Sequence, residues 1–154
     1  MIPYSRQYID DDDISSVIEV LKSDFLTQGT IISHFENSIS SYVDSPYTLC
    51  VNSATSALHL TYLALGLGPG LELWTSPNTF VSTSNAALFC GASVNFVDID
   101  KKTYCMSPES LEEKLLFHKK NSLPLPHIVT VVHFAGQSCN ICLLYTSPSP
   151  RDQR

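Results

Sequence analysis

Small polar residues stand between two apolar runs near the middle of the chain. Residues 52–56 (NSATS) follow a short apolar run at 48–51 and precede a longer one at 57–65. The first run has the length of a buried strand, and the second is apolar nearly all round, as a buried helix would be. Such a turn leaves hydroxyls and backbone N–H groups at a helix N-terminus, where the helix dipole also favours an anion. Taken alone, the stretch predicts either a phosphate site or an ordinary helix start capped by Ser53 or Thr55, and the ordinary cap is the commoner feature.

The composition is that of a globular protein without a basic surface. The chain has 154 residues, of which 44% are hydrophobic and 16% are charged, and its net charge is -6. The length suits one domain, and the negative charge argues against nucleic acid and anionic membranes as partners. Because no apolar run is long enough to span a membrane and the N-terminus is too polar for a signal peptide, we expect a cytoplasmic protein.

The cysteines and histidines do not indicate a metal site. The five cysteines lie mostly in apolar segments, and their odd number predicts buried, reduced thiols rather than a set of disulfides. Cys139 and Cys142 form a single C-x-x-C pair, which is weak evidence for zinc, and the histidines show no ligand spacing. We therefore predict that the chain binds no metal.

Strand and helix patterns alternate along most of the chain. Helices are expected after the carboxylates at 10–13, over 31–42 and 81–89, and from Ser107-Pro108 onward, whereas strands are expected at 48–51, 71–75, 93–97 and 127–134. This order predicts an α/β fold with a mostly parallel sheet flanked by helices. The polar stretches 52–56, 76–80 and 133–137 would then lie together beyond the carboxyl ends of the strands.

Four segments resemble the N-terminal part of sugar-nucleotide aminotransferases of the DegT/DnrJ/EryC1/StrS family. They are FLTQG, VNSATSALHLTYLALGLGPG, TSPNTFVSTSNAALFCGASVNFVDID and VVHFAGQ, and the resemblance covers about residues 2–137. It is strongest to the members that aminate a UDP-linked 4-keto-6-deoxy hexose in pseudaminic acid biosynthesis. The resemblance implies part of the large domain of an aspartate-aminotransferase-like fold (PLP fold type I), pyridoxal 5′-phosphate (PLP) as cofactor, an amino donor such as glutamate, and a homodimer.

The resemblance also implies roles for individual residues. Thr55 and Ser56 would bind the PLP phosphate, in agreement with the helix-terminus argument. Phe80 would lie against the pyridine ring, although a phenylalanine between a strand and a helix is by default a core residue. Tyr4, Thr27 and Gly29 would lie on the substrate side, near the sugar-nucleotide entrance.

The family's catalytic groups, by contrast, have no match in this sequence. PLP-dependent transamination needs a Schiff-base lysine and a carboxylate on the pyridine nitrogen, and in the family both follow the matched region. The six lysines present are expected on polar faces or in loops with ordinary pKa values: Lys22, Lys101, Lys102, Lys114, Lys119 and Lys120. The expectation is an inactive fragment of an enzyme, without catalytic residues of its own.

The same reasoning divides the chain into three parts. Residues 1–46 are predicted to be an N-terminal helical segment with a substrate-side loop, and residues 47–140 a partial PLP-binding α/β domain. Residues 141–154 are predicted to form neither helix nor strand and to be foreign or artefactual sequence. Because His133 has no known chemical role in the motif, we expect it to be a core or loop-anchoring residue.

Two other interpretations stay open. The chain could be a non-enzymatic α/β module that binds phosphate or nucleotides, although it contains neither GxGxxG nor GxxxxGK[ST]. It could also belong to a family relative with altered lysine chemistry, such as a dehydrase or a regulatory protein.

Overall fold

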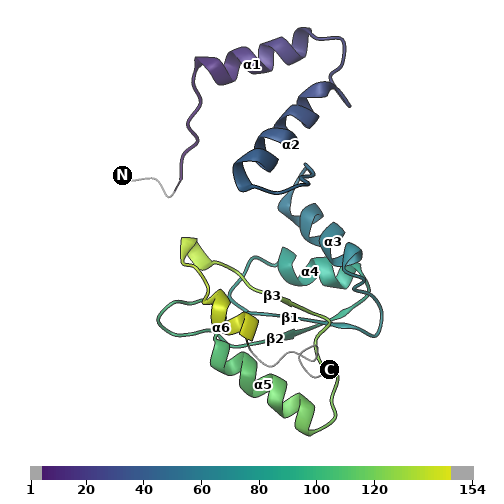
Figure 1. Cartoon of the computed structure of the whole chain (residues 1–154), viewed down its shortest axis with the longest axis vertical. Helices are drawn as coiled ribbons and strands as arrows, with labels where there is room; N and C mark the ends of the chain where they lie inside the picture. The colour runs from purple at the N-terminus through teal and green to yellow at the C-terminus, as the bar shows by residue number, and fades with distance from the viewer. Residues whose placement is uncertain (1–4, 147–154) are drawn as a thin grey trace. The chain divides into compact units, whose positions relative to one another are not determined.

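Six α-helices, three β-strands and one 3-10 helix form within residues 5–146, the part of the chain that the computed structural model describes. They are α1 (Asp11–Lys22), α2 (Thr30–Val43), α3 (Ala54–Ala64), β1 (Glu72–Thr75), α4 (Ser82–Phe89), β2 (Ser93–Phe96), α5 (Pro108–Lys120), β3 (Ile128–Thr130), η1 (Phe134–Gly136) and α6 (Ile141–Thr146) (Figure 1). The chain divides between Cys50 and Val51 into an N-terminal unit and a second unit.

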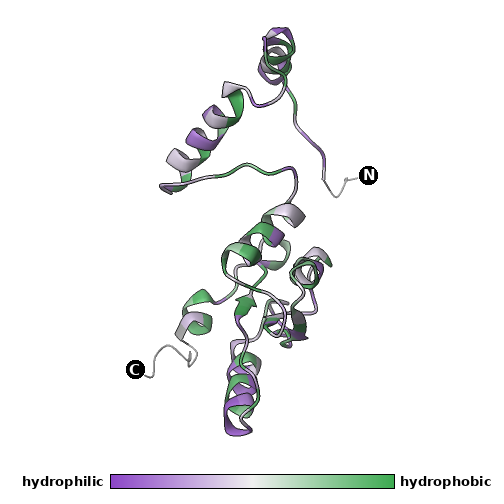
Figure 2. Ribbon diagram, turned by 90° about the vertical axis from the view of Figure 1, so that its right-hand side faces the viewer, coloured by the Kyte–Doolittle hydropathy of each residue, from purple (hydrophilic) through white to green (hydrophobic). Residues whose placement is uncertain are grey.

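The N-terminal unit contains two helices with well-defined ends. The Asp10 carboxylate accepts hydrogen bonds from the N–H groups of Asp12 and Asp13, and the Asp13 carboxylate accepts one from the Asp10 N–H, all at 3.1 Å. This reciprocal capping box confirms the predicted helix start after the acidic run. Hydrophobic and hydrophilic residues occur on both α1 and α2 (Figure 2), yet no residue of 5–50 is buried.

The second unit is built on a three-stranded parallel sheet with the strand order β2-β1-β3. Helices α3 and α4 lie on one face of the sheet, and α5 and α6 lie on the other (Figure 1). The predicted α/β fold with a parallel sheet is therefore confirmed. The strand predicted at 127–134 is shorter than expected, because only Ile128–Thr130 pair with β1.

The two faces of the sheet carry separate hydrophobic cores. Leu73 packs with Tyr62 of α3 and with the alanines of α4, whereas the next residue, Trp74, packs with Met106 and with Leu111 of α5. Because consecutive side chains of a strand point to opposite faces, β1 contributes to both cores. Leu73, Trp74 and Thr75 have no exposed surface, so the central strand is the most buried part of the unit.

The strand predicted at 48–51 does not form. Leu49 is 86% exposed, and the Cys50 N–H donates a hydrogen bond of 2.8 Å to a side-chain oxygen of Glu36. A short apolar run becomes a strand only where a neighbouring strand pairs its backbone groups, and the described sheet does not include residues 48–51.

The prediction that α3 is buried all round is also wrong. Tyr62 is its only buried residue, while Leu60 and Leu63 are each about half exposed. The helix covers the sheet with one side, and apolar composition alone does not distinguish a half-covered helix from a buried one. On α5, Leu116 is likewise 49% exposed, although it directly follows the buried Leu115.

Two predictions about the cysteines and the C-terminal segment need correction. Cys90, Cys105 and Cys139 are buried, as predicted, but Cys50 and Cys142 are exposed. Residues 141–146 form helix α6, where no helix was expected, and Leu144 packs against the core around Trp74. The remainder of the predicted foreign tail, from residue 147, lies outside the described residues. Within the described part, no helix is long and apolar enough to cross a membrane.

Candidate phosphate-binding site

The N-terminus of α3 carries the polar residues that the sequence singled out. The Ser53 hydroxyl accepts the Ser56 N–H at 3.2 Å, and the Ser56 hydroxyl donates to the Asn52 side-chain oxygen at 2.7 Å. The ordinary helix cap is therefore present. The cap uses only part of the first turn, in which the N–H groups of Ala54 and Thr55 have no carbonyl partner within the helix. An anion at this terminus could accept hydrogen bonds from them.

Thr55 connects this terminus to a second helix. Its hydroxyl oxygen lies 2.8 Å from that of Ser82, the first residue of α4. Ser82 is 7% exposed, whereas Thr55 is half-buried. The two residues are 27 positions apart in the sequence, and their contact fixes the position of the Thr55 hydroxyl. Because the contact joins a half-buried hydroxyl to a buried one, Ser82 holds Thr55 in one orientation.

Phe80 lies in the turn between β1 and α4, two residues before Ser82. Its side chain is 77% exposed, so the default expectation of a core phenylalanine is wrong. Its carbonyl accepts the Thr83 N–H at 3.1 Å, which ties the turn to the first residues of α4. An exposed aromatic ring in this turn offers a flat apolar face to a ligand.

Ser76 adds a buried hydroxyl at the carboxyl end of β1. It is 1% exposed, and its oxygen has no hydrogen-bond partner among the described side chains and backbone groups. The donor set around the ends of β1, α3 and α4 thus consists of hydroxyls and N–H groups, which suit a phosphate. Together with the exposed ring of Phe80, these groups fit a phosphorylated planar cofactor such as PLP.

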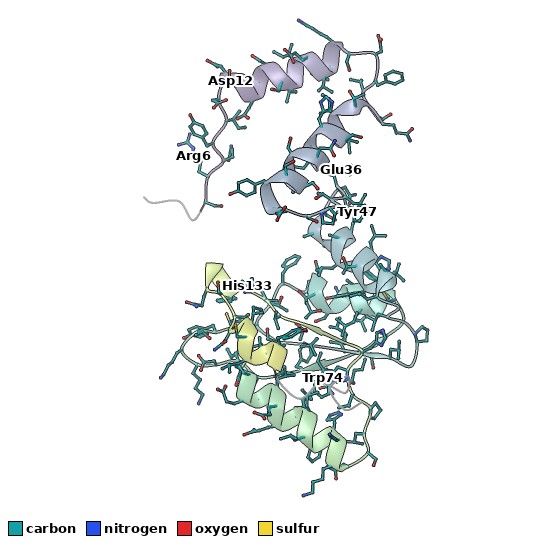
Figure 3. All side chains as sticks on the ribbon, in the orientation of Figure 1. Arg6, Asp12, Glu36, Tyr47, Trp74 and His133 are labelled. Carbon is teal, nitrogen blue, oxygen red and sulfur yellow. The ribbon has the colours of Figure 1, made fainter. Side chains whose placement is uncertain are left out.

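The predicted third polar stretch, 133–137, is connected to the second stretch through one loop residue. The Asn78 side chain donates to the Tyr104 carbonyl at 3.2 Å, and the Tyr104 ring lies 6.3 Å from that of Phe134. The ring nitrogen Nδ1 of His133 accepts the Cys139 N–H at 3.0 Å, which confirms the expected loop-anchoring role (Figure 3). The structure therefore connects the stretch 76–80 to both of the other polar stretches. Ser82, just after it, contacts the stretch 52–56, and Tyr104 contacts the stretch 133–137.

Tyr62 is a supporting residue that sequence reasoning missed. Its hydroxyl donates to the Thr83 carbonyl at 3.3 Å and lies 3.0 Å from the hydroxyl of Thr130, whose carbonyl accepts a hydrogen bond from Thr75. Burial raises the pKa of Tyr62 above its ordinary value, and the hydrogen bond with Thr130 opposes that effect. A tyrosine in an otherwise apolar helix needs a partner for its hydroxyl, and this was the signal available in the sequence.

Lys114 departs from the predicted behaviour of the lysines. Its amino group donates to the Asn95 side chain and to the Phe96 carbonyl, both at 2.6 Å, and lies 4.7 Å from the centroid of the Trp74 ring. Burial lowers the pKa of Lys114, while the carboxylate of Glu72 acts in the opposite direction. This lysine therefore joins α5 to β2 instead of lying in a fully solvated face.

Three substrate-side predictions receive no support from these contacts. Thr27 is exposed, and Gly29 precedes α2 in the N-terminal unit. Tyr4 lies outside the described residues. Their proposed roles stay predictions.

Comparison with known proteins identifies relatives over nearly the whole chain. The sequence profile of the DegT/DnrJ/EryC1/StrS aminotransferase family matches residues 7–145. The spore coat polysaccharide biosynthesis protein SpsC of Bacillus subtilis is 39% identical over 140 residues, which is 91% of this chain and 34% of SpsC. The UDP-4-amino-4,6-dideoxy-N-acetyl-beta-L-altrosamine transaminase of Campylobacter jejuni (serotype O:2) is 41% identical over 138 residues, 90% of this chain and 35% of the relative.

Solved structures give the same result for the fold. The chain superposes on Spr1654 of Streptococcus pneumoniae, assigned as a sugar aminotransferase, in its PMP-form with a TM-score of 0.83 and 29% sequence identity. The match covers 95% of this chain and 35% of that structure. The chain thus spans about a third of the length of the relatives that it matches.

Proposed function

Because the chain belongs to the DegT/DnrJ/EryC1/StrS aminotransferase family, we propose that it forms the phosphate-binding part of a PLP site. The whole enzyme would transfer an amino group, with glutamate as donor, to a 4-keto-6-deoxy sugar nucleotide. The Campylobacter jejuni relative supports this choice of sugar by its name. Pseudaminic acid biosynthesis is the proposed pathway, because the similar aminotransferase PseC of Helicobacter pylori is described as involved in it. The observation that carries the proposal is the Thr55–Ser82 hydrogen bond, with the exposed Phe80 two residues before Ser82.

Each residue of the proposed site has a specific task. Thr55 would donate its hydroxyl and backbone N–H groups to the phosphate oxygens, and Ser56 would redirect its hydroxyl and N–H groups from Asn52 and Ser53 to the phosphate. The positive end of the α3 dipole would stabilise the negative charge. Ser82 would hold the Thr55 hydroxyl in position, so less conformational freedom is lost on binding. Phe80 would cover one face of the pyridine ring. When bound, PLP supplies the electron sink that amino transfer requires.

We do not expect amino transfer from these 154 residues alone. None of the six lysines matches the family's Schiff-base lysine, and the amino group of Lys114 is held at β2 by Asn95 and Phe96. Homodimerisation, a cytoplasmic location and a substrate-side role of Thr27 and Gly29 are parts of the same proposal. They are tested on a longer protein that includes the lysine.

The proposal is tested by PLP binding to the chain. We expect Thr55→Val and Ser56→Ala each to weaken PLP binding by about 10- to 150-fold, because a hydrogen bond to a charged group contributes about 1.5–3 kcal/mol. Pyridoxal without the phosphate should bind weakly to all forms of the protein. Absorbance titration measures the affinities.

Ser107→Ala is the matched control. Ser107 caps α5 by accepting the Ser110 N–H at 3.1 Å, as Ser53 caps α3, but it lies outside the proposed site. Its substitution should leave PLP affinity unchanged. Equal loss of affinity in Ser107→Ala and Thr55→Val, or equal binding of PLP and pyridoxal, would contradict a phosphate site at α3.

A further inference from the structure

Two buried thiols from different loops of the second unit donate hydrogen bonds to carbonyls of the same segment, residues 132–137. Cys105, in the loop between β2 and α5, is 2% exposed, and Cys139, which follows η1, is 5% exposed. The Cys105 thiol donates to the Gln137 carbonyl at 3.2 Å, only two residues before Cys139. The Cys139 thiol donates to the Val132 carbonyl at 3.0 Å.

We propose that Cys105 and Cys139 form a reversible disulfide when the chain meets a two-electron oxidant such as hydrogen peroxide. One sulfur attacks the peroxide, giving a sulfenic acid and one molecule of water. The other sulfur then attacks the sulfenic sulfur, which releases the second water and forms the S–S bond. In total the two thiols lose two protons and two electrons, and the peroxide is reduced to two molecules of water.

The surroundings of the other cysteines favour this pair over the alternatives. The Cys90 thiol donates to the Ala86 carbonyl at 3.3 Å and belongs to the core on the opposite face of the sheet. Cys50 belongs to the N-terminal unit, and Cys142 is an exposed residue of α6. Burial raises the pKa of Cys139, and the neighbouring Cys105 adds to the effect. Because thiolate is the reactive form, oxidation of the pair should be slower than oxidation of exposed Cys50.

The disulfide would link two loops that already meet at the edge of the candidate site. Tyr104, directly before Cys105, contacts Asn78 through its carbonyl and Phe134 through its ring. A covalent bond between Cys105 and Cys139 would therefore restrict the segment 133–137 relative to the segment 76–80. Closing a loop of this size also lowers the entropy of the unfolded chain, which raises the thermal midpoint of unfolding by about 5–10 °C.

The test uses the full 154-residue chain with Cys50→Ser and Cys142→Ser, which leaves only the buried thiols. After treatment with hydrogen peroxide, the intact mass should fall by two hydrogen atoms, and a peptide map should show Cys105 linked to Cys139. Dithiothreitol should reverse both changes. The peptide map identifies the bond without any change at the buried positions, so the result does not depend on whether a buried variant folds.

Matched variants separate this pair from general oxidation. Cys90→Ser should still form the disulfide and show the higher midpoint, whereas Cys105→Ser and Cys139→Ser should show neither. A linkage that involves Cys90, or oxidation of the thiols to sulfinic acid without any linkage, would overturn the proposal. PLP binding does not enter the readout, so the result is independent of the proposed function.

Discussion

The two units of the chain differ in what holds their helices together. In the N-terminal unit, α1 starts at a complete capping box and α2 ends in a left-handed residue, Asp44, with a φ of 51°. Neither helix has a buried residue, and Ile18 and Phe35 remain 43% and 54% exposed. In the second unit, by contrast, the short strand β1 is covered from both faces.

The difference shows that the sequence signals that define the ends of a helix are separate from the burial that stabilises the fold. Caps and amphipathic spacing define where a helix begins and ends, but they contribute only about 1 kcal/mol each. Burial of large apolar side chains contributes about 1.5–3 kcal/mol for each residue. We therefore expect the second unit to unfold cooperatively. The backbone amides of the N-terminal unit should be much less protected against hydrogen exchange than those of the second unit.

The largest effect is expected at Trp74. Replacement by alanine removes a side chain with no exposed surface and also the ring beneath the Lys114 amino group. We expect the free energy of unfolding of the second unit to fall by about 3–5 kcal/mol. Urea denaturation followed by circular dichroism measures it. Leu21→Ala in α1, where the side chain is 64% exposed, is the control and should change stability by less than about 0.5 kcal/mol. Similar losses at Trp74 and Leu21 would remove the contrast between the units.

A smaller loss is expected for Tyr62→Phe. The substitution keeps the ring but leaves the Thr83 carbonyl and the Thr130 hydroxyl without the tyrosine hydroxyl, so unfolding free energy should fall by about 1–2 kcal/mol. Because the folded-state pKa of Tyr62 is raised, its contribution is complete below the ordinary value near 10 and is lost as pH rises through the folded value. The wild-type advantage over Tyr62→Phe should therefore shrink in alkaline solution, as measured by urea denaturation at several pH values. If the wild-type advantage grew with pH instead, the folded-state pKa of Tyr62 would not be raised.

Asp10→Ala tests the local contribution in the N-terminal unit. It removes both capping hydrogen bonds that the Asp10 side chain accepts, and we expect a cost of about 1 kcal/mol to α1. Helical circular dichroism should decrease while the unfolding transition of the second unit stays the same. Ser16→Ala is the control, because its hydroxyl donates to a carbonyl within the helix and not to its terminus. A shift of the main transition in Asp10→Ala would mean that the two units do not unfold independently.

The smallest effect on stability is expected at Phe80. Since the side chain is 77% exposed, Phe80→Leu should change the unfolding free energy by less than about 0.5 kcal/mol. The same variant should lower PLP affinity, because leucine lacks a flat ring. Denaturation and absorbance titration on one preparation compare the two quantities. A large loss of stability without a loss of affinity would identify Phe80 as a structural residue after all.

The elements with strong local signals were predictable from the sequence. The acidic residues before α1, the Ser107-Pro108 start of α5 and the glycine after α4 each mark a helix end by a specific physical requirement. The strand prediction for residues 48–51 was wrong because a strand needs a neighbouring strand to pair with, and the sequence of one segment does not show whether such a partner is present. The predicted burial of Leu60 and Leu63 was wrong because apolar composition does not show how much of a helix is covered by its neighbours.

The candidate site was predictable in part, and for a related reason. Thr55 and Ser56 stand in a recognisable stretch at the start of a helix, whereas Ser82 and Tyr62 matter through contacts across the fold. Thr55 is 27 residues from Ser82, and Tyr62 is 68 residues from Thr130. Spacing along the chain does not encode such pairs. Lys114 shows the same limit, since its lowered pKa results from burial that its polar neighbours in the sequence, Glu112 and Glu113, do not suggest.

The burial of residues 73–76 has a consequence for how the sequence can vary. Leu73, Trp74, Thr75 and Ser76 are each at most 1% exposed, and each meets neighbours on the sheet or on one of its faces. In a library of all single substitutions, these four consecutive positions should be the longest intolerant run in the second unit. The exposed positions of α1 and α2 should accept most replacements. A map of mutational tolerance would thus trace the central strand without reference to any ligand or activity.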